Sequence, residues 1–582
     1  MPNITTRVFP QIIFDSLVQQ GCSPTLARIF AARGIEQPSQ LETELSNLLP
    51  FEQLKNITEI AIILADAIAD QKRLLIIADY DSDGATACAV AIRALRKFGA
   101  CVNYLVPNRF DYGYGLTPEI VKLAATNNPN YRPDLIITVD NGIGSIEGVE
   151  EAIALGIKVL ITDHHLPSDR LPNATIIVNP NQPNCPFPSK NLAGVGVIFY
   201  VMLALRAELR KRNVFGTPSK EPNLASLLDL VALGTVADVV RLDWNNRTLV
   251  KQGLQRIRKG KACAGIYALL KVAKRDFHRI STNELGFVIG PRLNAAGRLD
   301  DMTLGIECLI TDDEHRAFAI ASQLDNLNRQ RRDIEANMQD SALDKLSINI
   351  NLQLSSKTAY SVCLYDPSWH QGVIGLIASR IKEKLHRPSI IFAPGNEGEI
   401  KGSGRSISGI NLRDALDLVS KRNPGLIKKF GGHAAAAGLT IMEQDFQCFQ
   451  AAFEQIAQQL LTPADLTHLI ETDGDLSETE LNLSLAQSFT EVVWGHGFPE
   501  PSFNAHFYVE NQRIVGEKHL KLKLRKLNSN TSYDAILFFH AEPLPEFIRA
   551  VYRLQANEFN GNTTLQLLIE HWSDNNNELK ND

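Results

Sequence analysis

The sequence predicts an α/β protein: a parallel-sheet domain, a long connecting helix, a second α/β domain and an all-β C-terminal region. Short apolar runs separated by helix-length segments predict parallel strands with helices on both faces. An apolar stripe from residue 311 to about 345 predicts the long helix, and alternating residues after Thr462 predict β-structure. With 582 residues, the chain has room for three or four domains.

The expected elements follow the chain in order, beginning with short helices and polar breaks before residue 50. Five strands are then expected at residues 74–78, 101–106, 135–139, 158–162 and 175–178. A capping box of Thr311 and Glu314 is expected to start the long helix. The second α/β unit is expected to contain strands at 360–365 and 389–393, with a helix from Val373 between them.

These patterns divide the chain into five parts. They are an N-terminal helical segment at 1–50, a first α/β domain at 51–260, a connecting region with the long helix at 261–350, a second α/β domain at 351–456 and a β-domain at 462–575.

Composition and charge exclude several classes of protein. The net charge of −6 gives no overall attraction to nucleic acid, so any polyanion site must be a local basic patch. The eight cysteines form no CxxC pair, which argues against a zinc ribbon or a disulfide framework. The N-terminus lacks signal-peptide features and no apolar run reaches membrane-spanning length, so we expect a soluble cytoplasmic protein.

The stretch LLIIADYDSDGATA, residues 74–87, places Asp79, Asp81 and Asp83 directly after a buried strand. Three crowded carboxylates repel one another and stay ionised only when cations neutralise them, which indicates divalent metal. Gly84 is expected to let the chain turn sharply into the following helix. A lone aspartate here would be an ordinary helix N-cap, but three in six residues favour the metal site.

Further metal-type ligands follow two other expected strands, because Asp140 follows 135–139 and Asp163-His164-His165 follows 158–162. Ligands of parallel-sheet proteins collect beyond the carboxyl ends of the strands. With Asp238, expected in a loop after Gly234, these side chains suit two adjacent Mn²⁺ or Mg²⁺ ions. Such a pair can clamp a phosphoryl centre. The expected metal ligands are Asp79, Asp81, Asp83, Asp140, His164, His165 and Asp238, with Asp163 as a catalytic partner of the histidines.

Arginines in segments rich in Gly or Asn are candidates for phosphate binding, because guanidinium and backbone groups together hold phosphate. The segment 290–301 is expected to be a basic, amide-rich loop, and 401–406 and 431–433 are expected to be glycine-rich loops. Each arginine is individually as well explained by a structural ion pair. The candidates are Arg109, Arg292, Asn294, Arg298 and Arg405, with Ser403 and His433 completing the pocket from the second unit.

A basic stripe lies in the C-terminal region, where strict alternation over residues 519–525 puts Lys521, Lys523 and Arg525 on one face of a strand. Such a face can follow a nucleic-acid backbone, and an ordinary solvated strand face is an equal alternative. Aromatic residues nearby can stack on bases or fill the core. They are Trp494, Phe498, Phe503, Phe507, Phe538 and Phe539.

The motifs resemble a known family. DYDSDG at 79–84, Asp140, Asp163-His164-His165 and the GTVAD motif ending at Asp238 resemble the DHH phosphoesterases. KGSGRS at 401 and FGGHAAAAG at 430 are similar to the accessory DHHA1 domain of that family. WHQGVIGLIASRI at 369 and GPRLNAAGRLDD at 290 narrow the resemblance to the RecJ family of exonucleases specific for single-stranded DNA.

The resemblance implies Mg²⁺- or Mn²⁺-dependent hydrolysis of single-stranded DNA from 5′ to 3′ into mononucleotides, in recombination and repair. It implies an oligonucleotide-binding (OB) barrel after Thr462 and a pocket for the 5′-phosphate at Arg109, Ser403 and Arg405. It also implies partners such as single-strand-binding protein and a helicase, and we expect a monomer. We expect the strand to pass through a cleft between the two α/β domains.

Two alternatives remain open. A phosphodiesterase with the same chemistry acts on short oligoribonucleotides or cyclic dinucleotides, but such enzymes usually lack the long helix and the third domain. An inactive DNA-binding scaffold would show eroded metal ligands, whereas all seven expected ligands are present in the sequence.

Overall fold

The computed structural model describes residues 3–107, 112, 115–126, 132–353, 359–527, 529–559 and 561–574. The chain forms two compact units. One contains residues 6–325 together with 471–582, and the other contains residues 326–470 with the first few residues of the chain. Among the described residues, no helix has both the length and the apolar character needed to span a bilayer.

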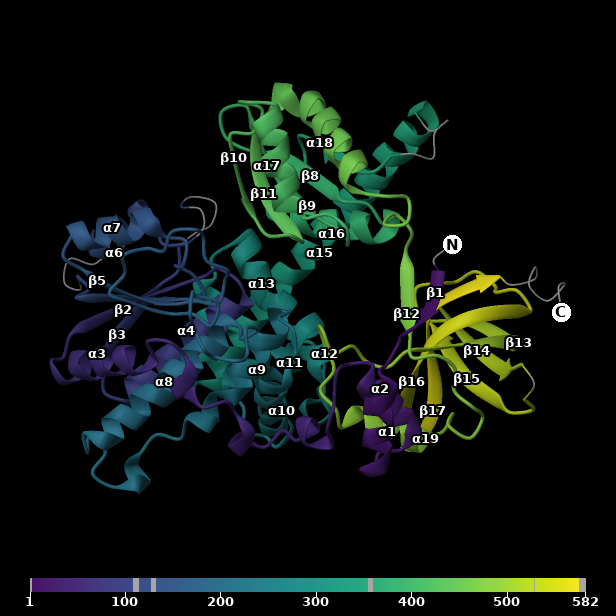
Figure 1. Ribbon diagram of the computed structural model, residues 1–582, viewed down its shortest axis with the longest axis horizontal. Helices are drawn as coiled ribbons and strands as arrows, with labels where there is room; N and C mark the ends of the chain where they lie inside the picture. The colour runs from purple at the N-terminus through teal and green to yellow at the C-terminus, as the bar shows by residue number, and fades with distance from the viewer. Residues whose placement is uncertain are drawn as a thin grey trace. The chain divides into compact units, whose positions relative to one another are not determined.

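A five-stranded parallel sheet forms the centre of the first α/β domain (Figure 1). In spatial order its strands are β3 (Cys101–Leu105), β2 (Arg73–Ala78), β4 (Leu135–Val139), β5 (Lys158–Thr162) and β6 (Ile176–Val178). The register aligns Ala78 with Val139 and Val139 with Thr162. The residues that follow these three strands therefore emerge together at one edge of the sheet.

Helices cover both faces of this sheet, which explains why its central strands are almost wholly apolar. On one face lie α6 (Pro118–Thr126) and α7 (Ile146–Ala154), whose apolar side chains share a core with β2, β4 and β5. On the other face lie α3 (Ile57–Ala69), α4 (Ser82–Lys97) and α8 (Gly194–Lys211) (Figure 1).

The region after the sheet is helical. Its helices are α9 (Leu228–Ala237), α10 (Trp244–Arg258), α11 (Ala264–Val272), α12 (Thr282–Glu284), α13 (Gly290–Leu299) and α14 (Thr303–Ile310), with a π-helical turn at Leu285–Ile289. The expectation of a loop at 290–301 was wrong, because this segment is mostly α13. Its glycines allow close packing instead of turning the chain: a Cβ at Gly297 would lie 1.9 Å from the Tyr80 carbonyl oxygen.

Of two smaller expectations in this region, the position of Asp238 in a turn beyond Gly234 is confirmed and the capping box of the long helix is wrong. Gly234 lies inside α9, where a Cβ would lie 2.1 Å from the Thr86 hydroxyl, and Asp238 directly follows that helix. The long helix α15 (Glu314–Gln353) is present, but Asp313 caps it by accepting hydrogen bonds from the amides of His315 and Arg316. The expected capping box of Thr311 and Glu314 is not the cap, because Thr311 binds the amide of Asp313 instead.

The second α/β unit has a mixed five-stranded sheet in the order β10, β11, β9, β8, β7. Its strands are β7 (Val362–Tyr365), β8 (Ser389–Pro394), β9 (Glu399–Arg405), β10 (Lys429–Gly432) and β11 (Ala436–Met442). Its helices are α16 (Ile374–Leu385), α17 (Leu412–Arg422) and α18 (Phe446–Leu460). The expected glycine-rich loop at 401–406 is mostly strand β9. Gly402 fits there because a Cβ would lie 2.5 Å from the Phe392 ring.

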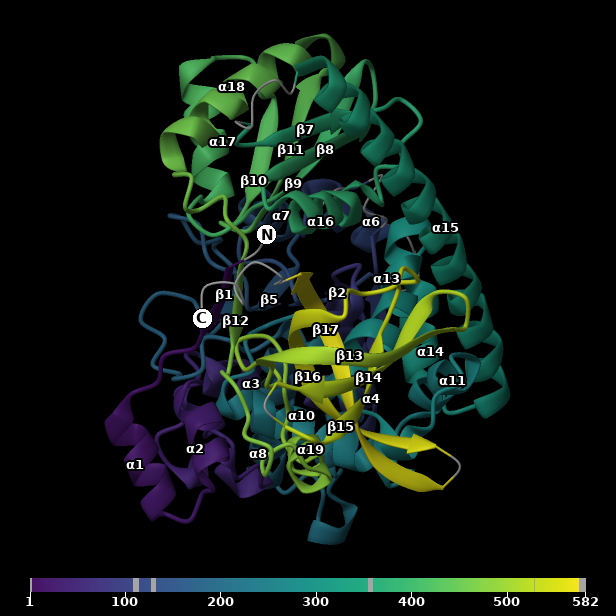
Figure 2. The same cartoon turned by 90° about the vertical axis from the view of Figure 1, so that its right-hand side faces the viewer.

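The C-terminal strands close into a barrel in the order β13, β14, β15, β17, β16, visible in the lower half of Figure 2. They are β13 (Phe503–Val515), β14 (His519–Lys526), β15 (Ser532–Leu537), β16 (Phe547–Phe559) and β17 (Asn562–Asp574), preceded by α19 (Leu483–Thr490). At the N-terminus β1 (Asn3–Thr6) pairs with β12 (Leu469–Thr472), and α1 (Gln11–Gln19) and α2 (Pro24–Ala31) follow. The expected fold class is confirmed.

Candidate metal centre and substrate-binding residues

The aspartates after β2 are held in place by backbone amides. Asp81 is the N-cap of α4, and its Oδ1 accepts hydrogen bonds from the amides of Asp83 (2.9 Å) and Gly84 (3.0 Å). Asp79 Oδ1 accepts one from the amide of Tyr80. Gly84 lies in the first turn of α4 and does not make the expected sharp turn. A Cβ there would lie 2.4 Å from the Asp79 carbonyl oxygen, so glycine permits the close approach of helix and loop.

The carboxylate of Asp83 lies against the start of α8, where it accepts hydrogen bonds from the amides of Gly194 (2.6 Å) and Val195 (2.9 Å). A helix N-terminus favours an ionised carboxylate. A Cβ at Gly194 would lie 2.5 Å from the side chain of Asp140. Sequence reasoning assigned no role to this helix start, although the glycines of Leu192–Gly196 are a signal of close backbone approach.

Three carboxylates converge on one imidazole nitrogen. His164 Nε2 lies 3.1 Å from Asp140 Oδ1, 3.4 Å from Asp238 Oδ2 and 3.9 Å from Asp83 Oδ2. Asp140 has a left-handed backbone with φ of 62°, a conformation that costs a non-glycine residue about 1–3 kcal/mol. The packed sheet edge holds this strained residue in position, because the end of β4 that leads into it is buried and its amide donates a hydrogen bond to the Thr162 carbonyl oxygen of β5 (3.0 Å).

Asp163 orients the neighbouring histidine. Its Oδ1 lies 2.7 Å from His165 Nδ1 and accepts hydrogen bonds from the amides of His164 and His165, while its Oδ2 accepts one from Ile143. Burial alone would raise the pKa of Asp163, but the hydrogen bond and charge of His165 hold that pKa below its usual value. A carboxylate behind a ligating histidine fixes the ring and its tautomer.

Two asparagines that sequence reasoning missed hold the backbone of the histidine pair. Asn179 donates a hydrogen bond from Nδ2 to the carbonyl oxygen of His165 (2.9 Å), and Asn181 donates one to that of His164 (2.6 Å). The sequence pointed to these asparagines by their position, because they directly follow β6, which pairs with the strand β5 that precedes Asp163.

The structure brings all seven expected metal ligands together in overlapping sets. Within each set, one ligand atom from each residue lies within 4.8 Å of the others. The three sets are Asp140, His164 and His165; Asp83, His164 and Asp238; and Asp79, Asp81 and Asp140. Because Asp140 and His164 each belong to two sets, the cluster suits adjacent cations that share ligands.

The electrostatics of the cluster disfavour several ionised carboxylates unless protons or cations neutralise them. Burial and the neighbouring carboxylate of Asp81 raise the pKa of Asp79 to about 8 and that of Asp83 to about 7. Burial and the same group of carboxylates raise the pKa values of Asp140 and Asp238 well above their usual range. Asp140 Oδ1 is buried, and no described group donates a hydrogen bond to it. Carboxylate oxygens with imidazole nitrogen fit Mn²⁺ or Mg²⁺.

The arginine and amide candidates near α13 contact other parts of the protein. Arg292 is buried and its guanidinium binds Asp325 at 2.8–2.9 Å. Asn294 Oδ1 accepts hydrogen bonds from the amide (2.7 Å) and hydroxyl (2.8 Å) of Ser82, so it fixes the aspartate loop. Arg298 is half-buried in the last turn of α13. Arg109 lies outside the described residues.

In the second unit, Ser403 and Arg405 lie together on β9. Arg405 Nη1 donates hydrogen bonds to Ser403 Oγ (3.2 Å) and to the Gly404 carbonyl oxygen (2.8 Å). A Cβ at Gly375, in the first turn of α16, would lie 3.0 Å from Ser403 Oγ and 3.1 Å from Arg405 Nη2. A helix start beside a guanidinium and a hydroxyl is suited to an anion. His433 follows β10 and is exposed.

On the barrel, the basic stripe occupies the outward face of β14, and the intervening leucines are buried. Lys523 lies 3.5 Å from Asp534, and Arg525 binds Glu510 at 2.8 Å. The aromatic candidates divide clearly. Trp494, Phe498, Phe503 and Phe507 are buried, whereas Phe538 (45% exposed) and Phe539 (85% exposed) flank His519 at one end of the stripe.

Comparison with known proteins agrees with this geometry. The model of the DHH family, N-terminal domain, matches residues 73–235, and the DHHA1 domain matches 355–459. The RecJ OB domain matches 472–571. A parallel sheet with an aspartate–histidine cluster at its edge, followed by a DHHA1 domain, defines the class of DHH phosphoesterases.

Relatives narrow the class to one family. The single-stranded-DNA-specific exonuclease RecJ of Dickeya dadantii is 47% identical over 578 residues, which are 98% of this chain and 99% of that protein. The crystal structure of RecJ from Thermus thermophilus with Mn²⁺ superposes with a TM-score of 0.80 at 29% identity, covering 98% of this chain and 79% of that chain. Its complex with Mg²⁺ gives a TM-score of 0.75 at 28% identity and covers 98% and 78%. The chain belongs to the RecJ family.

Proposed function

We infer that this protein is a metal-dependent exonuclease that hydrolyses single-stranded DNA. The observation that carries this conclusion is the convergence of Asp83, Asp140 and Asp238 on His164 in a chain that matches RecJ exonucleases over nearly its whole length. We further propose that hydrolysis runs from 5′ to 3′, releases 5′-mononucleotides and serves recombination and repair.

The residues that would hold Mn²⁺ or Mg²⁺ are Asp79, Asp81, Asp83, Asp140, His164, His165 and Asp238. Bound there, the cations supply neutralisation of phosphate charge and activation of water. The protein's own part is to hold the phosphodiester in position, to keep water access limited and to fix the ligands. Asp163 positions His165, while Asn294 positions Ser82 and with it the aspartate loop.

We propose that Ser403 and Arg405, beside the start of α16, bind the terminal 5′-phosphate. The contact between Arg405 and Ser403 and the closeness of Gly375 support this assignment. The same role is proposed for Arg109 on the basis of its motif, and contacts with substrate phosphates are proposed for Arg298 and His433. The ion pair of Arg292 with Asp325 favours a positioning role for that arginine.

We propose that the barrel binds the incoming strand along Lys521, Lys523 and Arg525. Basic side chains that follow one strand, with exposed aromatic rings at its end, combine the two elements of single-strand recognition, namely backbone charge and base stacking. We also propose that the chain acts as a monomer and, as the resemblance implies, works with a single-strand-binding protein and a helicase.

The test uses single-stranded DNA labelled at either end, incubated with Mg²⁺ or Mn²⁺ and the wild-type protein, Asp81→Ala or Asp81→Asn. Asp81→Asn keeps the shape of the N-cap and removes the charge, which separates loss of metal from loss of folding. We expect immediate release of a labelled mononucleotide from the 5′ end, and none from either variant.

Two results would contradict the proposal that the protein is an exonuclease, and a third would contradict only its polarity. Hydrolysis of dinucleotides without degradation of long strands would favour the phosphodiesterase of short substrates. Binding of DNA without any hydrolysis would favour the inactive scaffold. Release of label from the 3′ end first would overturn the polarity but leave the exonuclease itself in place.

A further inference from the structure

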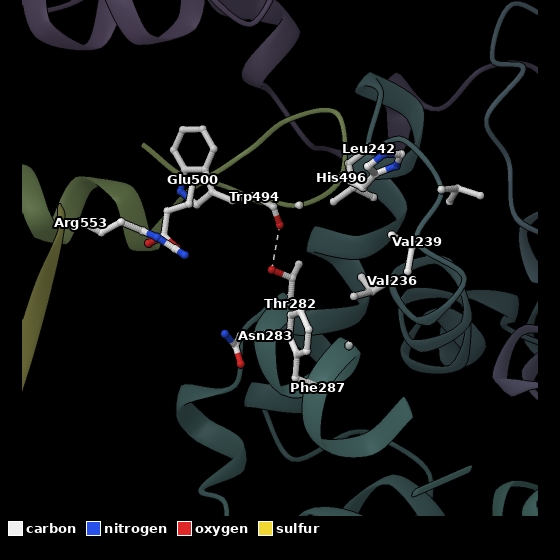
Figure 3. A pocket seen from close by; sticks show the side chains of 13 residues that line it. Val236, Val239, Leu242, Thr282, Asn283, Phe287, Trp494, His496, Glu500 and Arg553 are labelled. Carbon is white, nitrogen blue, oxygen red and sulfur yellow. Dashed lines mark hydrogen bonds and ion pairs between the residues drawn. The ribbon is translucent and has the colours of Figure 1, made fainter. Parts of the chain in front are cut away.

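A hollow of about 290 Å³ lies between the helical region after the parallel sheet and the loop that leads into the barrel (Figure 3). Val236, Val239, Leu242 and His496 line one side, and Trp494, Glu500 and Arg553 line the opposite side. Thr282, Asn283 and Phe287 lie between them. Thr282 closes one end through a hydrogen bond from its hydroxyl to the Trp494 carbonyl oxygen (2.8 Å). The hollow is near the lower limit for small-molecule sites, a size suited to one flat ring system.

Phe287 is a large apolar side chain that is exposed to solvent although its neighbours on the same turn are buried. It is 74% exposed, and it lies on the π-helical turn between α12 and α13. Turns of this type are rare and occur frequently at functional sites. The neighbouring Leu285 and Ile289 of the same turn are fully buried, so the turn is anchored while the Phe287 ring is presented to solvent.

The segments that line the hollow adjoin those that hold the metal cluster at two points. Val239 directly follows the ligand Asp238, is 60% exposed and has a φ of 60°, which is a genuine outlier for a β-branched residue. On the other side, the carbonyl oxygen of Gly290, which ends the π-helical turn, accepts a hydrogen bond from Ser82 in the aspartate loop (3.0 Å). Strained residues of this kind collect at ligand-binding sites.

The charges around the hollow indicate a neutral occupant. Among the described residues that line it, Arg553 is the one arginine or lysine, and it is already paired with Glu500 (2.8 Å) and Glu570. An acidic peptide or a phosphate would therefore gain little there. The remaining lining offers apolar surface, one exposed aromatic face and the hydrogen-bonding side chains of Asn283 and His496 at the edge, which suit the face and the edge of a nucleobase.

We propose that this hollow is a nucleobase subsite for the DNA strand, in which the Phe287 ring stacks on the base of a nucleotide 3′ to the one being released. This inference rests on the proposed function, because it takes the strand at the metal cluster as the source of the base. Phe287 is therefore a substrate-binding residue, and it extends the contacts with the DNA strand to a nucleotide on the 3′ side of the cleaved bond.

The experiment measures KM and kcat of the full-length protein with Mn²⁺ on a 5′-phosphorylated oligothymidylate and on a series with one abasic residue at successive positions. We expect Phe287→Ala to raise KM by about 5-fold to 100-fold with a smaller change in kcat. In the wild type, an abasic residue at one position of the strand should raise KM by about the same factor as Phe287→Ala does. In Phe287→Ala, an abasic residue at that position should cause no further rise in KM. Phe287→Trp should restore KM, and DNA should quench its indole fluorescence.

The matched control is Phe318→Ala, which removes another exposed phenylalanine, 41% exposed on α15, and should leave KM unchanged. An unchanged KM in Phe287→Ala, or an abasic penalty that persists in it, would overturn the base subsite. Failure of the proposed exonuclease activity gives a different result from failure of the base subsite, because the wild-type protein would then not hydrolyse DNA. The fluorescence of Phe287→Trp would test stacking even in that case, and an unquenched signal would refute it.

Discussion

At the scale of single residues, the cluster depends on side chains that hold the ligands as much as on the ligands themselves. Asp163 accepts three hydrogen bonds from the histidine pair and a fourth from Ile143, and it is buried. Burial would lower the pKa of His165, but the hydrogen bond and charge of Asp163 raise it to about 9. The ring is therefore protonated at neutral pH until a cation displaces that proton.

Replacing Asp163 by asparagine should weaken metal binding without unfolding the sheet. Asparagine keeps the shape but removes the charge that orients and polarises His165, and losses of this kind cost about 10-fold to 100-fold in metal affinity. Titration of Mn²⁺ by calorimetry provides the measurement. Asp169→Asn, an exposed aspartate of the same loop, is the control, and equal affinities in the two variants would contradict the assigned role.

Gly84→Ala should damage the same site by steric means. The new Cβ would lie 2.4 Å from the Asp79 carbonyl oxygen, so the aspartate loop must move. We expect a loss of about 1–3 kcal/mol in the free energy of unfolding, together with a large fall in kcat. Gly144→Ala, in a loop with no atom within 4 Å of the new Cβ, should do neither, as denaturant titration and nuclease assays would show.

At the scale of elements, β14 combines core and surface functions through simple alternation. Its leucines are buried in the barrel, and its basic side chains face outward. Two of these are partly neutralised, because Lys523 lies near Asp534 and Arg525 binds Glu510. The stripe is thus less basic than the sequence alone indicates, and its members are not equivalent.

This difference predicts that Lys521→Ala weakens DNA binding more than Lys523→Ala does. A phosphate contact on a single strand contributes about 0.7 to the slope of log affinity against log salt, and the pairing with Asp534 should reduce the share of Lys523. Fluorescence anisotropy with labelled oligonucleotide at several salt concentrations measures both slopes. A larger loss for Lys523→Ala would contradict the reduced share of Lys523, and unchanged binding in both variants would show that the outward face of β14 is not the binding surface.

A second element-scale contact joins the N-terminal helices to the barrel region. Arg33, just after α2, binds Asp473 through two hydrogen bonds of 2.7 and 2.9 Å, and each side chain is 1% exposed. Arg33 Nε also donates to the Pro499 carbonyl oxygen. The helices α1 and α2 therefore belong to the same compact unit as the barrel, and that unit begins at residue 6.

Breaking this pair should be costly because it leaves a buried charge without its partner. We expect Asp473→Asn to lower the free energy of unfolding by about 3–5 kcal/mol and to expose the N-terminal helices to protease. Asp475→Asn is the control, since Asp475 is half exposed and its pair with Lys526 should contribute at most about 1 kcal/mol. Equal proteolysis of the two variants would argue against the role of the Arg33–Asp473 pair.

At the scale of the whole molecule, metal binding and stability are linked. The buried carboxylates hold protons in the folded, metal-free chain that the unfolded chain has already lost at neutral pH, because their pKa values are raised. The stability of the metal-free protein therefore falls as pH rises, until the pKa of about 8 of Asp79 is passed. Cations replace those protons and remove the penalty.

Removal of metal by a chelator should accordingly lower the melting temperature and abolish hydrolysis. At a Mn²⁺ concentration one hundred times the dissociation constant, we expect about 2.7 kcal/mol of stabilisation. Calorimetric melting should show a larger Mn²⁺ effect above the pKa of about 8 of Asp79 than below the pKa of about 7 of Asp83. An effect that is independent of pH would contradict the proton–metal exchange.

The fold class and the place of the cluster were predictable from the sequence for one physical reason. Polar residues that directly follow buried parallel strands must emerge at the same edge of the sheet, so Asp79, Asp140 and Asp163 had to come together. The β-structure of the C-terminal region was predictable because alternation with a period of two determines which face of a strand is buried, whereas its closure into a barrel was implied only by the family resemblance.

Only the tertiary structure decided what depends on contacts between distant segments. Glycines in 290–301 and 401–406 looked like loop residues, yet they lie in α13 and β9, because glycine is needed wherever another element approaches closely. Likewise, Arg292 forms an ion pair with Asp325, and the carboxylate of Asp83 accepts hydrogen bonds from the start of α8. Phe287 is exposed on a turn whose other apolar side chains are buried. Local sequence determines periodicity, whereas the partner and exposure of each side chain depend on which segments pack against it.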